Sequence, residues 1–226
     1  MQPFNVSHSL LTKENKIKKI SKSRLASISA TSVLILSAFA SVPQAQAADG
    51  TTSLASVLTA KNSFDKNATN YDIVTAAVLA VLKAKPNSPV KVLTDGTVAV
   101  TAFIPNDMAF ENLVTALTGK RPKTEAAAFA TVAGLGIDTV EQILEYHVVP
   151  GTAIMSGDAL KANGAVLMTA LPGKTIKVSV SGGKLIQLHA FNTKLRTPKV
   201  ILTQVDINKG NLQVAHGIDA VLMPTK

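Results

Sequence analysis

The side chains that could do chemistry are few in this chain. After residue 47 there are three histidines, and there is no cysteine anywhere, which excludes disulfides, thiolate metal ligands and a thiol nucleophile. His147 and His216, together with Asp107 and Asp219, could supply two imidazoles and a carboxylate, a ligand set that suits a metal ion. No pair of histidines has the spacing of one helix face, so we expect no metal centre and no cofactor.

Motifs of common enzyme classes are absent from the sequence. It has no His-Glu-x-x-His, no nucleophile elbow, no glycine-rich phosphate loop and no paired-carboxylate signature. Gly182-Gly183 precedes a predicted strand rather than a helix, and therefore indicates a hairpin turn. We expect a protein that is not an enzyme, and keep a metal-assisted enzyme as a third hypothesis.

His147 lies in a stretch that begins as a helix and breaks at Pro150-Gly151. Val140, Ile143, Leu144 and His147 share one helix face, which predicts that the imidazole points into a core. Tyr146, one position round the helix, is predicted to be the residue that faces outward. A capping box formed by Thr139 and Gln142 is expected to begin this helix.

Composition and charge limit the class of protein. The chain has 226 residues, 46% of them apolar and 4% aromatic, which fits one domain with a core of Ala, Val, Leu and Ile. Of the formal charge of +9, the first 47 residues hold +5, and the remainder has 17 basic and 13 acidic residues. This weak excess argues against nucleic acid as a partner and is compatible with loose attraction to anionic cell-surface polymers.

The N-terminal segment has the pattern of an export signal. Residues 13–24 are basic, residues 32–42 are apolar, and Ala45-Gln46-Ala47 is a small-x-small site. We expect residues 1–47 to be a signal peptide cleaved before Ala48. The mature protein would then be secreted and extracellular, with no stable membrane insertion. Association with the cell wall and retention of the segment as an anchor are left open.

Helical patterns dominate the first half and strand patterns the second, which predicts an α+β fold. Asp72 is expected to cap the first long helix, and Asn106 or Asp107 the second, with Pro105 and Phe110 as its hydrophobic staple. The expected helices cover residues 53–59, 73–85, 108–117, 124–133 and the stretch before His147. The expected strands cover 98–104, 165–170, 174–180, 185–190, 199–207 and one or two within 212–222.

Three blocks of the chain together resemble a fasciclin-type domain. They are Thr101–Phe110, with strand, proline and helix; Leu144–Gly151, with a Tyr-His pair; and Val214–Pro224, the closing block. Their order fits one complete copy, similar to single-domain secreted copies from actinobacteria, so residues 48–226 are expected to form a single domain. Gly217 departs from the family pattern, in which an aliphatic residue is usual.

The resemblance implies a fold and a role. The fold is a wedge of two small β-sheets with helices packed around one side. The role is adhesion to a cell-surface or matrix protein or polysaccharide, and we expect a monomer. The implied binding residues are Tyr146 and His147, with Asn106 and Asp107 nearby, and the motif residues with a structural role are Pro105, Phe110, Pro150, Gly151, His216 and Asp219. The alternative function is an extracytoplasmic carrier of a small apolar ligand, because small side chains leave room for a cleft.

Overall fold

Strand β1, Val100–Pro105, is the centre of the first of two sheets in this computed structural model. It pairs with β2, Val148–Pro150, in antiparallel fashion and with β6, Gln213–Ile218, in parallel. Every residue of β1 and β6 is buried. The structure describes residues 50–60, 62–191 and 195–224, so the predicted signal peptide and its cleavage site lie outside the described residues.

The second sheet is an antiparallel meander of β3, β4 and β5. Its strands are Val166–Met168, Thr175–Ser181 and Leu185–His189. Buried and exposed residues alternate along β4 and β5, as the period of a strand with one solvated face requires. The Gly182-Gly183 hairpin is confirmed, and both glycines have positive φ, which other residues adopt only at a cost.

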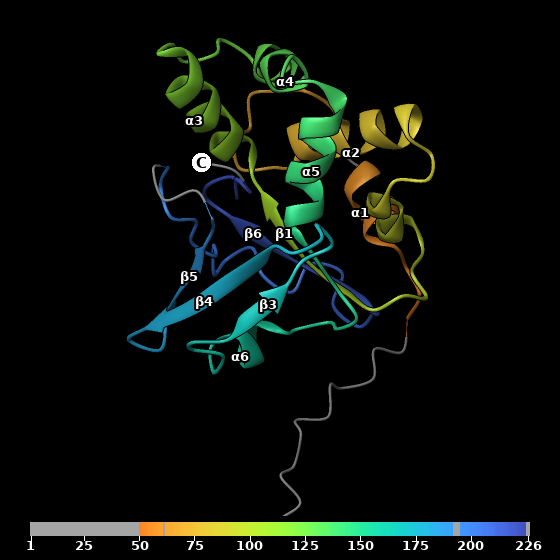
Figure 1. Ribbon diagram of the computed structural model, residues 1–226, viewed down its shortest axis with the longest axis vertical. Helices are drawn as coiled ribbons and strands as arrows, with labels where there is room; N and C mark the ends of the chain where they lie inside the picture. Colours follow the sequence, from red (N-terminus) through yellow and green to blue (C-terminus); the bar gives the residue numbers. More distant parts are fainter. Residues whose placement is uncertain (1–49, 61, 192–194, 225–226) are drawn as a thin grey trace, which may run out of the picture. The chain divides into compact units, whose positions relative to one another are not determined.

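Helices α2 to α5 lie together on one side of the first sheet, above it in Figure 1, while β3, β4 and β5 lie below. The fold is therefore α+β, as expected. Among the described residues no single helix has the length and apolar character to cross a membrane. Helices α4 and α5 have that length and apolar character only when they are taken together, and they are bent by 106° relative to each other. The helix bounds are α1 Leu54–Thr59, α2 Asp72–Ala84, the 3-10 helix η1 Pro89–Thr94, α3 Asp107–Thr118, α4 Glu125–Ala133, α5 Ile137–Tyr146 and α6 Ser156–Ala159.

Strand β1 separates two apolar cores because its side chains point alternately to opposite faces. Ala102 and Ile104 belong to the first core, with α2 to α5. Phe103, between them, belongs to the second core, where it packs with buried residues of β4 and β5 such as Val178 and Leu188. The first sheet is therefore covered on both faces, by helices on one and by the second sheet on the other.

The expected Asn106 cap of α3 is confirmed, whereas the expected Asp72 cap of α2 is not. The side chain of Asn106 accepts a hydrogen bond from the Ala109 N–H at 3.0 Å. Asp72, expected to be a cap, is the first residue of α2 instead. The first N–H groups of α2 are satisfied from another helix, since the Asp107 carboxylate accepts from the N–H groups of Asp72 and Ile73, at 3.2 and 2.8 Å.

The predicted capping box of α5 is wrong. The helix begins at Ile137, two residues before Thr139, and its N-cap is Gly136 with a φ of +89°. A glycine adopts this conformation without strain and makes no side-chain cap. The chain therefore enters α5 directly from the turn that ends α4.

The predicted strand over residues 199–207 is also wrong. Only isolated bridges form there, joining Lys199 to Gln187, Val200 to Ile218 and Ile207 to Ala215. The segment passes from the second sheet to the first, so it cannot stay in register with either one. Val200 is buried there, but Leu202 is 42% exposed.

Candidate functional site

Tyr146 is buried, so the expectation that it faces outward is wrong. Its side chain is 0% exposed and packs in the second core. The hydroxyl donates to the Thr175 carbonyl at 2.9 Å and accepts from the Phe191 N–H at 3.0 Å. Burial raises the pKa of this phenol. The helix pattern could not reveal this, because the second sheet covers the side of α5 that an isolated helix would expose.

His147 points inward, as its helix face predicts. The imidazole Nε2 accepts a hydrogen bond from the Leu222 N–H at 3.0 Å, and Nδ1 lies 2.7 Å from the Ile143 carbonyl. Nδ1 must therefore carry the proton and donate it to Ile143, which fixes the neutral tautomer. Burial lowers the pKa of His147 to about 4. The ring joins the end of α5 to the C-terminal segment, and direct binding to a partner stays a prediction.

Asn106 and Asp107 form hydrogen bonds to the N-termini of helices and not to Tyr146 or His147. Asn106 caps α3, and Asp107, which is 0% exposed, holds the N-terminus of α2. Burial raises the pKa of Asp107 to about 7, with smaller contributions from the charges of Glu125 and Asp72. Within the described ranges, no hydrogen bond joins Asn106 or Asp107 to Tyr146 or His147. The four residues do not form one site.

A cluster of carboxylates next to Asp107 was not predicted. Oxygen atoms of Asp65, Asp72 and Glu125 lie within 4.8 Å of one another, a geometry that can hold a cation. The carboxylates also accept hydrogen bonds from the backbone, from Ser63 N–H to Asp72 and from Asp65 N–H to Glu125. Burial raises the pKa of Glu125. The three residues come from a loop, α2 and α4, and only the folded chain brings them together.

His216 is also a buried, neutral imidazole. Its Nε2 donates to the Ile154 carbonyl at 2.8 Å, and Nδ1 accepts from the Asp206 N–H at 3.3 Å. Burial lowers its pKa. Both nitrogens of both buried histidines, His147 and His216, are thus used within the protein, and neither ring can bind a metal or transfer a proton without breaking these contacts.

The remaining motif residues position backbone. Pro105 ends β1, Phe110 is buried in the first core, and Pro150 ends β2 before Gly151, whose φ is +87°. Gly217 has a physical explanation as well. A Cβ atom there would lie 2.3 Å from the Tyr71 hydroxyl, so that tyrosine fills the space of the usual aliphatic side chain.

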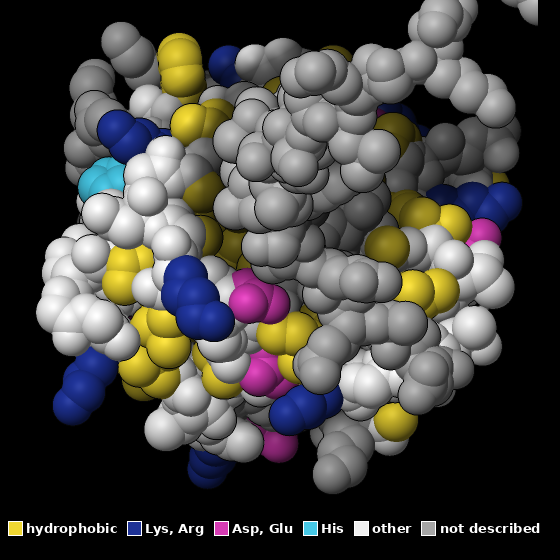
Figure 2. All heavy atoms as spheres, turned by 90° about the horizontal axis from the view of Figure 1, so that it is seen from below, with side chains coloured by type: hydrophobic (Ala, Val, Ile, Leu, Met, Phe, Trp, Pro, Cys, Tyr) yellow, Lys and Arg dark blue, Asp and Glu magenta, His cyan; other side chains and the backbone are white. Residues whose placement is uncertain are grey.

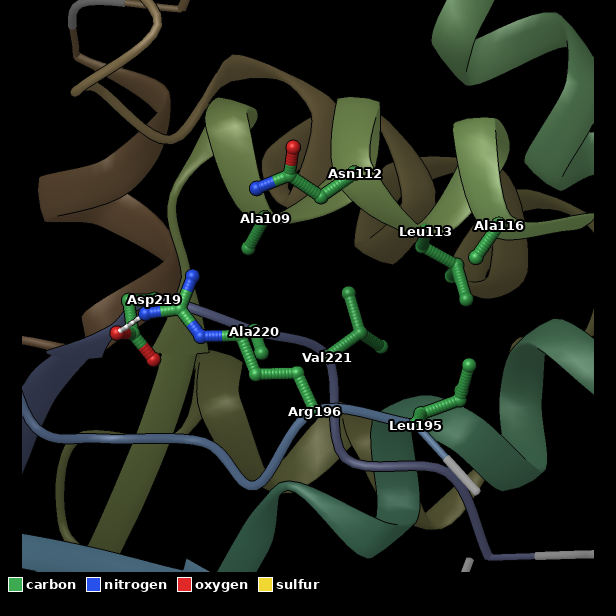
Figure 3. Close-up of a pocket in the computed structure, with 9 residues that line it drawn as sticks. All are labelled: Ala109, Asn112, Leu113, Ala116, Leu195, Arg196, Asp219, Ala220 and Val221. Atoms are coloured by element: carbon green, nitrogen blue, oxygen red, sulfur yellow. Dashed lines mark hydrogen bonds and ion pairs between the residues drawn. The ribbon is translucent and has the colours of Figure 1, made fainter. Parts of the chain in front are cut away.

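Asp219 closes one end of a shallow groove between α3 and the C-terminal segment (Figure 3). It pairs with Arg196 and accepts a hydrogen bond from the Lys199 N–H at 2.8 Å. The groove is mainly apolar, with Leu113 and Val221 on its walls, and has a volume of about 80 Å³. A second apolar pocket, between the two sheets, has about 20 Å³. Pockets for small ligands are usually several hundred Å³, so these two give the carrier hypothesis no support.

A larger, open cleft of about 390 Å³ lies on the second sheet. Lys174, Lys177, His189 and Phe191 are among its lining residues. The ammonium of Lys174 lies 4.0 Å from the centroid of the Phe191 ring, a cation–π contact that holds the charge at the cleft. Sequence reasoning missed this cleft, although the lysines stand out in a stretch of the chain without acidic residues.

Comparisons with known proteins identify the family. The model of the Fasciclin domain matches residues 74–224. Among solved structures, the chain is similar to a FAS1 domain pair from the insect cell adhesion molecule fasciclin I, with 16% sequence identity and a TM-score of 0.46. That match covers 66% of this chain but only 46% of the other, and a search of curated proteins finds no match. Since the family model spans more than half of its residues, this protein belongs to the fasciclin domain family.

Proposed function

We propose that this protein is a secreted, non-enzymatic adhesion module that binds a cell-surface or matrix protein or polysaccharide. The observation that carries the proposal is the Fasciclin domain match over residues 74–224, because domains of this family are generally adhesion modules and typically extracellular. The N-terminal export pattern is consistent with this location.

The state of the buried histidines supports a role without catalysis. An acid–base or metal-bound histidine needs a ring nitrogen that can reach a substrate or an ion. His147 and His216 use both nitrogens on the backbone of the protein itself. Exposed Lys177 and His189, by contrast, face solvent on the second sheet, where a large partner can reach them.

Attachment of cells tests the adhesion proposal. Protein purified from its own host is coated on a surface, and the producing cells are counted after washing. We expect more attached cells than on a control protein of equal net charge. Equal attachment to the two coatings would overturn the proposal.

The export proposal has a separate test. Mass spectrometry of protein from the culture fluid is expected to show a chain that begins at Ala48. Recovery of only the uncleaved chain, in the membrane fraction, would contradict secretion and leave the adhesion assay unaffected.

A further inference from the structure

The positive charge of this protein is concentrated in the segment of the chain that contains the second sheet. Residues 159–205 contain seven Lys or Arg and no Asp or Glu, whereas the other residues after 47 contain ten basic and thirteen acidic ones. The second sheet lies entirely within this segment. The weak net charge of the whole therefore hides one strongly cationic region in an otherwise slightly acidic protein.

The outer face of the second sheet presents part of this charge to solvent. Along β4, Ile176 and Val178 are buried while Lys177 between them is exposed. Lys177 is paired in register with His189 of β5, so their side chains stand on the same face about 5 Å apart at Cβ. Within the part of the chain that the structure describes, the ion pairs do not involve Lys174 or Lys177.

Polar and apolar groups accompany the cations. Thr175, Ser179 and Gln187 alternate with the buried residues on the same face, and offer hydroxyl and amide groups. Phe191 is 48% exposed at the cleft. Figure 2, which shows the molecule from below, has Lys and Arg side chains at several places over the described surface, a histidine beside one of them, and apolar side chains between.

We propose that the cleft of Lys174, Lys177, His189 and Phe191 binds an acidic polysaccharide, whose carboxylate or sulfate groups pair with the two lysines. This inference rests on the proposed adhesion function and names its partner. Charge complementarity selects a polyanion. The neighbouring hydroxyl and amide groups match sugar hydroxyls, and one aromatic ring can pack against a sugar. A single-stranded nucleic acid would need several aromatic rings for its bases, and the cleft has one.

Tyr146 supports this cleft from inside the protein. Its buried hydroxyl bonds the Thr175 carbonyl and the Phe191 N–H, and both Thr175 and Phe191 line the cleft. Tyr146 is thus a positioning residue, one that affects binding without touching the partner. Tyr146 is buried and cannot contact a partner directly, but in this way it can still affect how tightly the partner binds.

The test compares two double variants of the full-length protein with the same loss of charge. Lys174→Gln/Lys177→Gln removes the cleft cations, and Lys83→Gln/Lys91→Gln removes two exposed lysines of the helical half. Binding is measured by biolayer interferometry to polygalacturonate, sulfated dextran, neutral dextran and duplex DNA, at about 50 mM salt, where charge pairs are weakly screened.

We expect wild-type protein to bind an acidic polysaccharide and not neutral dextran. The cleft variant should bind at least about tenfold more weakly, and the control variant about as tightly as wild type. Equal losses of affinity in the two variants would show that binding depends only on the net charge of the protein, and would overturn the proposal. Tighter binding to DNA than to either acidic polysaccharide would do the same and point to a phosphate polymer. Binding without cell attachment would instead contradict adhesion alone.

Tyr146→Phe tests the support of the cleft. It keeps the ring but loses both hydrogen bonds, and we expect severalfold weaker polysaccharide binding by protein that circular dichroism shows to be folded. Tyr71→Phe, measured where it too is folded, removes a partly buried hydroxyl that bonds Gln204 and does not reach the cleft, and should bind like wild type. Unchanged binding by Tyr146→Phe, or an equal loss in both variants, would overturn the positioning role.

Discussion

The two sheets of this protein have the same number of strands but treat polar side chains in opposite ways. In the first sheet every residue of β1 and β6 is buried, so polar groups such as Gln213 and His216 find all their partners inside. In the second sheet one face is solvated, and Lys177 and His189 stand on it. A polar residue of the first sheet therefore holds the fold together, whereas one of the second sheet is available to a partner.

We expect the largest loss of stability from a substitution that breaks the buried hydrogen bonds of the first sheet. Gln213 is 0% exposed; its Oε1 accepts from the Leu54 N–H, and its Nε2 donates to the Val92 and Asp95 carbonyls. Gln213→Glu would turn an oxygen toward these carbonyls and bury an unpaired charge. We expect a loss of more than about 3 kcal/mol in the free energy of unfolding, measured in urea.

The matched control for this change is Gln187→Glu on the second sheet, which should change the free energy of unfolding by less than about 0.5 kcal/mol. Similar losses in the two variants would mean that the sheets do not differ in the way described.

The second effect concerns the buried imidazole at the end of α5. His147→Ala leaves a cavity and an unpaired Leu222 N–H, and we expect a loss of about 3 kcal/mol, measured by urea unfolding. His189→Ala, on the exposed face, should cost far less. Full stability of His147→Ala together with weaker cell attachment would instead identify His147 as a direct contact.

A third effect, of about the same size, depends on pH and on Asp107. Its pKa is about 7 in the folded protein and about 3.9 in an unfolded chain, so the folded state binds the proton more tightly. The stabilisation by this proton is complete below about pH 4 and is lost as the pH rises to about 7. Wild type should therefore lose roughly 3 kcal/mol relative to Asp107→Asn between these values.

Urea unfolding of both proteins across this pH range measures the difference. His147 and His216 titrate equally in the two proteins and cancel in the comparison. A difference that stays constant with pH would show that folding does not raise the pKa of Asp107.

The smallest effect is expected on the open sheet. The hydroxyl of Ser179 lies 2.8 Å from His189 Nε2 on the solvated face. Water can replace this contact, so Ser179→Ala should change the free energy of unfolding by less than about 0.5 kcal/mol, as thermal unfolding would report. A larger loss would mean that the face is more rigid than its exposure indicates.

The sequence predicts what depends on local pattern. The Asn106 cap, the inward face of His147 and the alternation of β4 all follow from neighbours along the chain. The three motif blocks resemble the family that the comparison then identifies.

Contacts between distant segments could not be predicted in this way. Asp107 holds the N-terminus of a helix more than thirty residues before it, and Tyr146 is buried by strands that come after it. The cationic face of the second sheet could be predicted only in part. The run of basic residues is visible in the sequence, but the face of the sheet on which the lysines lie is visible only in the fold.

The parallel pairing of β1 with β6 has a consequence for the time course of folding. Val100 pairs with Gln213, so the centre of the first sheet is completed only when nearly all of the intervening chain has been made. Contacts so remote along the chain form slowly, because a long loop must close before they contribute. Until β6 has been synthesised, β1 lacks one of its two neighbouring strands and the first sheet is incomplete, which would suit the proposed export of the chain before it folds.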